Sequence, residues 1–206
     1  MSIQQNLNGG KFMEPHSQAD ANEYLVVVES QIRECFGRVV YSHKTHEKCA
    51  DIALNVNNRL KLFQIILSAI ITTSLIVKIV GDTHWAIYVA ALLSTLQFGI
   101  NAYTKDFDLG EIAQKHSHAA SSLWNIRELY FSLLTDIRTN RLSLDQIAIE
   151  RNKIQELLNS IYKGSPRTNS KAYAMATKSL KLNEELTFSD LEIDNFLPNE
   201  LKKNST

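Results

Sequence analysis

The sequence has few of the residues that interrupt helices. It holds three prolines and seven glycines among 206 residues, and no proline occurs between Pro15 and Pro166. Because proline breaks helices and glycine weakens them, long helices can form across this stretch. Alternation of the kind that marks strands is also missing, as is an internal repeat. The sequence therefore predicts an all-α fold.

The sequence also has few cysteines and no formal net charge. Cys35 and Cys49 are the only cysteines, and on one helix they would stand about 21 Å apart along its axis, too far for a bridge. We expect free thiols in a reducing compartment. The 22 basic residues balance the 22 acidic ones, which argues against nucleic-acid binding by bulk electrostatics. The segment before Tyr24 lacks the apolar core of a signal peptide.

Catalytic signatures are missing as well. We find no glycine-rich phosphate loop, nucleophile elbow or paired-carboxylate motif, so we expect neither an enzyme nor a cofactor. His43, His46 and Cys49 recur three apart and carry groups that bind transition metals. A progression of three drifts around a helix, however, and H-x-x-H-E is not the zinc motif H-E-x-x-H. We expect packing or surface polarity there and no metal.

Two apolar stretches, 62–80 and 85–103, stand almost back to back in an otherwise polar chain. Each would span about 28 Å as a helix, close to the hydrocarbon thickness of a bilayer. The second holds no charge and has Trp85, Tyr88 and Tyr103 near its ends, where aromatic rings favour the interface. We interpret the pair as a membrane hairpin. The alternative is a soluble bundle with two central buried helices.

Flanking charges predict the orientation of the hairpin. The connector 81–84 has no Lys or Arg, whereas basic residues flank the outer ends of both stretches: Lys44, Lys48, Arg59, Lys61, Lys105 and Lys115. By the positive-inside rule, both termini should be cytoplasmic. Lys78, near the far end of the first stretch, is a single exception.

The chain divides into five predicted parts: a flexible segment 1–19, a cytoplasmic amphipathic helix 20–60, the hairpin 61–104, a cytoplasmic helical region 105–187 and a C-terminal arm or tail 188–206. Ser17 and Asp20 resemble a capping box, and the Asn57–Asn58 pair is the expected weak point of the leading helix. The second span should extend into a helix that ends at 139–140. Further helices are predicted over 144–163, capped by Ser143 and Gln146, and over 168–186.

Polar side chains share one face in each apolar stretch, at spacings of three and four. They are Gln64, Ser68 and Thr72, continuing from Lys61, and then Ser94, Gln97 and Asn101. Polar groups are costly against lipid, so these faces either line a water-filled path in an oligomer or hydrogen-bond within one hairpin. Two spans cannot enclose a pore alone, so the first interpretation requires a homo-oligomer.

A basic stripe is predicted near the C-terminus, where no acid occurs between Glu156 and Glu184. On a helical wheel, its four members fall within about 80° of one another: Arg167, Lys171, Lys178 and Lys181. The stripe could contact anionic lipid headgroups, a phosphorylated small ligand or acidic residues of a neighbouring subunit. A solvated charged face is the alternative.

Four phrases in order resemble the SLATT family of bacterial two-transmembrane effectors. They are YSHKTHEKCADIALNVNNRLKLFQIILSAIITTSLI, then NAYTKDF, KHSHAASSLWNIRELYFSLLTDI and EELTFSDLEIDNFLP. The resemblance covers about Tyr24 to Leu201 and implies an antiphage or conflict effector of the bacterial inner membrane that acts by pore formation or membrane disruption. It implies a nucleotide-producing or reverse-transcriptase partner. Matching positions are His46, Glu47 and the polar residues of both spans.

The residues and the resemblance together lead to one functional hypothesis. The chain is expected to be a homo-oligomeric membrane effector whose cytoplasmic helices hold the spans closed until a signal or partner changes their packing. The alternative is a membrane-anchored, non-conducting scaffold that recruits a partner enzyme through its cytoplasmic helices.

Overall fold

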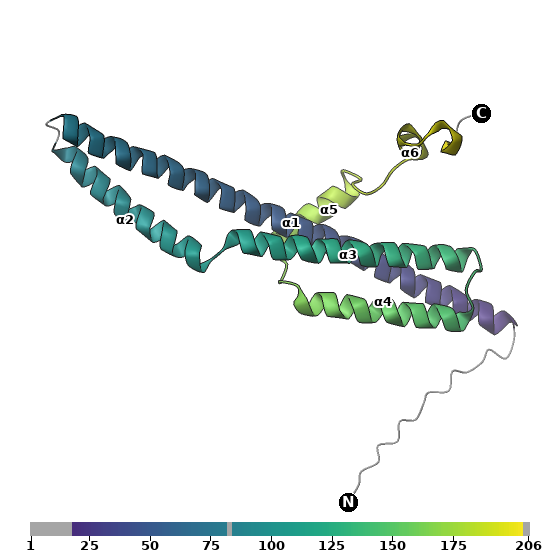
Figure 1. The fold of residues 1–206 in the computed structure, drawn as a ribbon. Coiled ribbons are helices and arrows are strands. Elements are labelled where there is room, and N and C mark those ends of the chain that lie inside the picture. The colour runs from purple at the N-terminus through teal and green to yellow at the C-terminus, as the bar shows by residue number, and fades with distance from the viewer. Residues whose placement is uncertain (1–17, 82–83, 204–206) are drawn as a thin grey trace, which may run out of the picture.

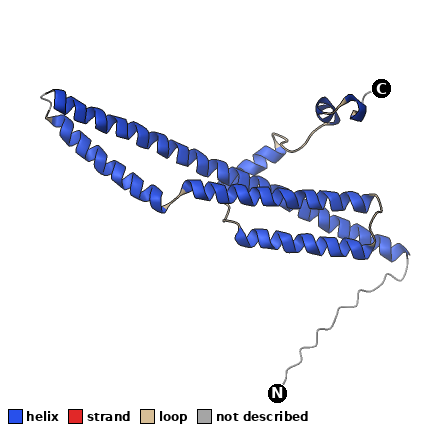
Figure 2. Cartoon of the chain, viewed as in Figure 1, coloured by secondary structure: helices blue, strands red, loops and turns tan. Residues whose placement is uncertain are grey.

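The computed structural model describes residues 18–81 and 84–203, and within them the chain is helical without strands (Figure 2). Figure 1 shows a long hairpin that projects from a helical bundle. The elements, in chain order, are α1 Gln18–Val80, α2 Trp85–Asp106, α3 Leu109–Arg138, α4 Leu144–Gly164, α5 Ser170–Lys181, α6 Asp190–Phe196 and a 3-10 turn Asn199–Leu201. The predicted all-α class is confirmed.

Helix α1 runs without interruption from the bundle into the hairpin, over 63 residues. Its continuity follows from the absence of proline and from pairs such as Glu29–Arg33, one helical turn apart. The expected weak point at Asn57–Asn58 was wrong, because both residues are helical. Propensity alone costs too little at two positions to stop a helix of this length. Ser17 lies outside the described residues, so the structure does not address the first capping box.

The second arm of the hairpin is interrupted where the sequence predicts continuity. Helix α2 ends at Asp106, Phe107 leaves helical geometry with φ −115° and ψ 78°, and α3 begins at Leu109. The Asp108 side chain accepts a hydrogen bond from the Glu111 amide at 3.0 Å, which caps α3. A continuous helix across this point was therefore a wrong expectation, since the aspartate starts a new helix instead.

The core of the bundle lies between the first half of α1, α3 and α4. Its centre consists of fully buried side chains that recur at helical spacing: Ile32, Val39, Leu123, Ile126 and Tyr130. The reciprocal Ser143–Gln146 capping box starts α4 as predicted. Asn140, with φ 51°, makes the turn from α3 into α4. Helix α4 then lies along the bundle beside α3 (Figure 1).

Helix α5 packs across α1 through small side chains, and α6 stands apart from the bundle (Figure 1). Ala172 and Ala176 are fully buried, which allows close approach of the two helices. Helix α5 spans Ser170–Lys181 rather than the predicted 168–186. Left-handed backbone at Glu184 and Leu186, with φ 52° and 70°, ends the helical path sooner.

The apolar stretches are exposed on the surface of the chain. In the most apolar windows of the two long helical arms, 6% and 11% of residues are buried. Ile79 is 83% exposed, Leu92 72% and Phe98 75%. A soluble bundle would have to bury these side chains, so that alternative was wrong. An apolar surface of this length matches the hydrocarbon core of a bilayer.

Candidate functional site: a polar hairpin seam and a histidine pair

Four of the six predicted polar residues form direct hydrogen bonds across the hairpin. Gln64 Nε2 donates to Asn101 Oδ1 at 2.9 Å, and Gln97 Nε2 donates to Ser68 Oγ at 2.6 Å. We call these four residues the polar seam. The Gln97 Oε1 atom is buried without a hydrogen-bond partner among the described residues. In a lone hairpin the seam therefore bonds the two spans to each other.

The other two predicted residues lie outside the seam. Thr72 is exposed, and its hydroxyl donates to the Ser68 carbonyl of its own helix at 2.9 Å. Ser94 is exposed on α2. Bonding a hydroxyl to the preceding turn satisfies its donor, which makes an outward threonine compatible with lipid or with a neighbouring helix. The sequence pattern thus places the seam residues and the outward-facing Thr72 and Ser94 on the same faces, whereas the structure separates these two groups.

A buried pair of histidines joins α1 to α3 in the bundle. The Nδ1 atoms of His46 and His116 are 3.0 Å apart, and both side chains are at least 95% buried. One Nδ1 must donate its hydrogen to the other, so the contact requires at least one neutral ring. Burial, helped by positive charge on His116 and His43, lowers the pKa of His46 to about 4. Burial lowers the pKa of His116 as well.

A second group of contacts lies one turn away on the same helices. His43 Nδ1 lies 2.9 Å from the Ala120 carbonyl, and the His43 ring packs against Trp124. The Arg127 guanidinium stacks over Trp124 at 4.3 Å from the ring centroid. Its Nε is buried without a hydrogen-bond partner among the described residues. Together with the histidine pair, these contacts fix the register of α3 on the part of α1 that leads into the membrane.

An ion pair ties the connector after α5 to this region. Lys44 Nζ lies 2.8 Å from Glu47 and 2.5 Å from Glu185. The Lys44 bond is the main reason that the pKa of Glu185 falls to about 2. Glu47, which the family resemblance singles out, also lies 3.7 Å from His43. One lysine therefore links helix α1 to the segment that precedes the C-terminal arm.

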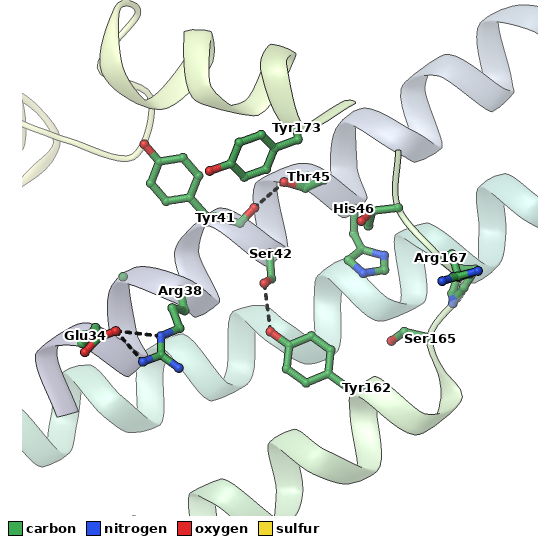
Figure 3. Close-up of a pocket in the computed structure, with 13 residues that line it drawn as sticks. Glu34, Arg38, Tyr41, Ser42, Thr45, His46, Tyr162, Ser165, Arg167 and Tyr173 are labelled. Atoms are coloured by element: carbon green, nitrogen blue, oxygen red, sulfur yellow. Dashed lines mark hydrogen bonds and ion pairs between the residues drawn. The ribbon is translucent and has the colours of Figure 1, made fainter. Parts of the chain in front are cut away.

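Figure 3 shows an open cavity between α1, the end of α4 and the start of α5. Its volume is about 890 Å³. Its lining includes three tyrosines, hydroxyl groups, the Glu34–Arg38 pair and one edge of His46. The Tyr162 and Ser42 hydroxyls meet across it at 2.9 Å. The cavity thus reaches from solvent to the histidine pair, but its paired side chains bond to each other.

The basic stripe is only partly assembled. Lys171, Lys178 and Lys181 lie exposed on α5. Arg167 precedes that helix and lines the cavity of Figure 3 instead. Placing Arg167 on the same helical face was wrong, because Asn169 caps α5 and the helix begins at Ser170. Three lysines, not four basic residues, form the stripe.

The structure separates the three side chains that were considered as metal ligands. His43 bonds to Ala120, His46 to His116, and Cys49 Sγ lies 3.7 Å from the Asn169 amide. Within residues 18–81 and 84–203, no cluster of three or more His, Cys, Asp or Glu side chains is placed to hold a metal ion.

Sequence reasoning missed His116 and Glu185. His116 shares the buried face of α3 with Ala113, Ala120 and Leu123. A histidine in register with that apolar face was the signal available. Glu185 lies 141 positions from Lys44, and no local pattern indicates such a pair.

These features define a two-span helical membrane protein with a helical bundle on one side of its hairpin. The sequence model of the SMODS and SLOG-associating 2TM effector domain family 4, one of the SLATT families, matches residues 28–192. The chain belongs to this family, as its sequence resemblance indicates. No curated protein and no solved structure matches the chain significantly.

Proposed function

We propose that the chain is a non-enzymatic effector that permeabilises the bacterial inner membrane as a homo-oligomer, with both termini in the cytoplasm. The polar seam is the observation that supports this proposal most. Four polar side chains at membrane depth bond to each other in one copy. The same groups can line a water-filled path when several hairpins assemble, because polar side chains favour cavities over lipid.

The long helix supplies the link between bundle and membrane. Helix α1 is continuous through both, whereas the other arm of the hairpin, formed by α2 and α3, has a break at Phe107–Asp108. A change in the packing of α1 against α3 is therefore transmitted along α1 into the first span. Helix α2 can follow it by bending at the break. In this proposal the cytoplasmic bundle holds the spans closed until a signal or a partner, such as a nucleotide-producing or reverse-transcriptase protein, changes that packing.

The test compares membrane insertion with ion leakage. We would express the full chain in bacteria, wash the membranes at alkaline pH, and record membrane potential with a voltage-sensitive dye. We expect retention in the washed membrane and depolarisation on expression. The variant S68L/T72L/S94L/Q97L should stay in the membrane and lose depolarisation, because it removes four of the six polar side chains on these faces.

Two outcomes would count against the pore. Depolarisation by the leucine variant at the level of the native chain would show that these faces do not line a path. Retention of the native chain without any depolarisation, with or without a partner, would favour the non-conducting scaffold. The variant L62A/L92A, which changes exposed apolar residues in the same spans, controls for altered insertion.

A further inference from the structure

The end of the chain separates positive from negative charge in consecutive segments. From 157 to 183 there are five basic residues and no acid, and from 184 to 201 there are six acids and no basic residue. We call 184–201 the acidic segment; it comprises the connector after α5, helix α6 and the 3-10 turn. Such a division places two complementary surfaces next to each other in the sequence.

The acidic segment exposes apolar side chains that the chain itself does not cover. Phe188 is 63% exposed, Leu191 66%, Phe196 83% and Leu201 65%. A short helix with this much exposed apolar surface is normally stabilised by contact with another surface. The reciprocal Ser189–Glu192 capping box sets the start of α6. The segment therefore has a defined local structure and lacks a cover.

The basic face of α5 offers a matching surface. Lys171, Lys178 and Lys181 fall within about 80° of one another on this helix, and Leu182, 74% exposed, follows on the same side. Among the described residues, none of the three lysines has an ion-pair partner within 4 Å. Glu184 and Glu200 of the acidic segment are exposed and equally unpaired within the described part of the chain. Opposite charges thus flank apolar groups on both surfaces.

The path of the chain directs the acidic segment away from its own α5. The Lys44–Glu185 ion pair and the bond from the Glu185 amide to the Ser179 carbonyl, at 3.1 Å, fix the connector at the end of α5. Figure 1 shows α6 beyond that end, apart from the bundle. The basic face behind the connector therefore remains open for another molecule.

We propose that the acidic segment of one copy docks on the basic face of α5 of a second copy. The two surfaces differ, so the contact is head to tail, and repetition of such a contact forms a ring when the rotation between copies closes. This inference rests on the proposed function, because it supplies the assembly that a two-span pore needs. It gives the three stripe lysines a subunit contact rather than a lipid or phosphate ligand.

The test uses charge reversal and cross-linking in the full chain in membranes. A photo-reactive amino acid replaces Phe196, and two copies carry different tags. We expect a cross-linked product that contains both tags and maps to 170–182. Reversal of the basic face, K171E/K178E/K181E, or of the acidic segment, E184K/D190K/E200K, should each abolish it. The double reversal K153E/K163E on α4 serves as the matched control and should leave it unchanged.

Co-expression separates lost docking from lost folding. Each reversed variant alone lacks a complementary pair, but a mixture of the two restores one opposite-charge contact and retains one native contact. The cross-link should therefore return in the mixture. A cross-link unaffected by either reversal, confined to one chain or formed with a different protein would overturn the proposal. Depolarisation by the native chain with no cross-link would overturn the docking and leave the pore intact. A charge-dependent cross-link without depolarisation would support the docking and overturn the pore.

Discussion

His46 and His116 place their Nδ1 atoms 3.0 Å apart inside the bundle, 70 positions apart in the sequence. The pair lies between the helix that enters the membrane and the helix that follows the return span. Because the contact requires at least one neutral ring, it links the packing of α1 on α3 to the protonation state of the site.

Acidification should loosen the bundle through the histidine pair. The pKa of His46 is lowered from 6.5 to about 4, so the folded state binds fewer protons than the unfolded one. The stabilising contribution is complete above about pH 6.5 and is lost as pH falls toward 4, by up to about 3 kcal/mol. Positive charge on His116 and His43 adds to this resistance to protonation. Urea unfolding of the chain in micelles between pH 8 and 4.5 measures the loss.

Removal of the pair should flatten this dependence. The double variant H46L/H116L replaces two buried neutral rings by apolar groups and removes both titrating sites. The variant H118Q, in which an exposed histidine of α3 changes, should keep the native pH profile. An unchanged pH profile in H46L/H116L would show that the histidine pair is not the source of the pH dependence of stability.

The Gln97–Ser68 bond should couple the two spans energetically. Gln97 already has one buried oxygen without a partner, so S68A leaves its amide unbonded as well. We expect S68A to cost about 1 kcal/mol and the double variant S68A/Q97L to cost less than the sum of the single changes. Steric trapping in micelles measures each free energy of unfolding. The exposed S94A should stay within about 0.5 kcal/mol of the native chain, and additivity of S68A and Q97L would rule out the coupling.

The Asp108 cap should set the break between α2 and α3. The substitution D108A removes the hydrogen bond to the Glu111 amide and should destabilise the bundle by about 0.5–2 kcal/mol. The variant D106A, two residues earlier at the end of α2, changes an exposed aspartate for which no cap bond is present among the described contacts. Thermal unfolding followed by circular dichroism compares the two. Equal effects of D108A and D106A would show that the cap is not the cause.

The bundle should depend on a small set of buried side chains. Leu123 is fully buried in the core, so L123A should cost about 2–5 kcal/mol through lost burial and the cavity it leaves. The matched variant L157A changes a leucine that is 42% exposed on α4 and should cost much less. Chemical unfolding in micelles tests both, and a small effect of L123A would contradict the core as described.

Local patterns account for much of the fold. The length and polarity of 62–80 and 85–103 predict the hairpin, because a bilayer imposes a length on any spanning helix. The Ser143–Gln146 box predicts the start of α4, since capping depends on residues three positions apart. Failures occurred at Asn57–Asn58 and at Asp108. At Asn57–Asn58 the low helix propensity of asparagine is outweighed by the continuity of a long helix. At Asp108 a single capping side chain is enough to start a new helix.

The candidate site shows the same division. Periodicity grouped Gln64 with Ser68 and Gln97 with Asn101 on one face of each span, but it did not indicate which side chains would bond across the hairpin. The predicted basic stripe was wrong at Arg167, because Asn169 caps α5 by accepting a hydrogen bond from the Ala172 amide, so the helix begins after Arg167. His116 and Glu185 were missed, since their partners lie far away along the chain.

The sequence by itself determined the helical class, the two spans, the SLATT membership and the charge division at the C-terminus. Each of these depends on composition or on spacings within one element. Only the tertiary structure decided the His46–His116 pair, the Lys44–Glu185 link, the bonds of the polar seam and the direction of the acidic segment. These depend on how α3 and α5 settle against α1, where burial and hydrogen bonds between distant residues outweigh local preference.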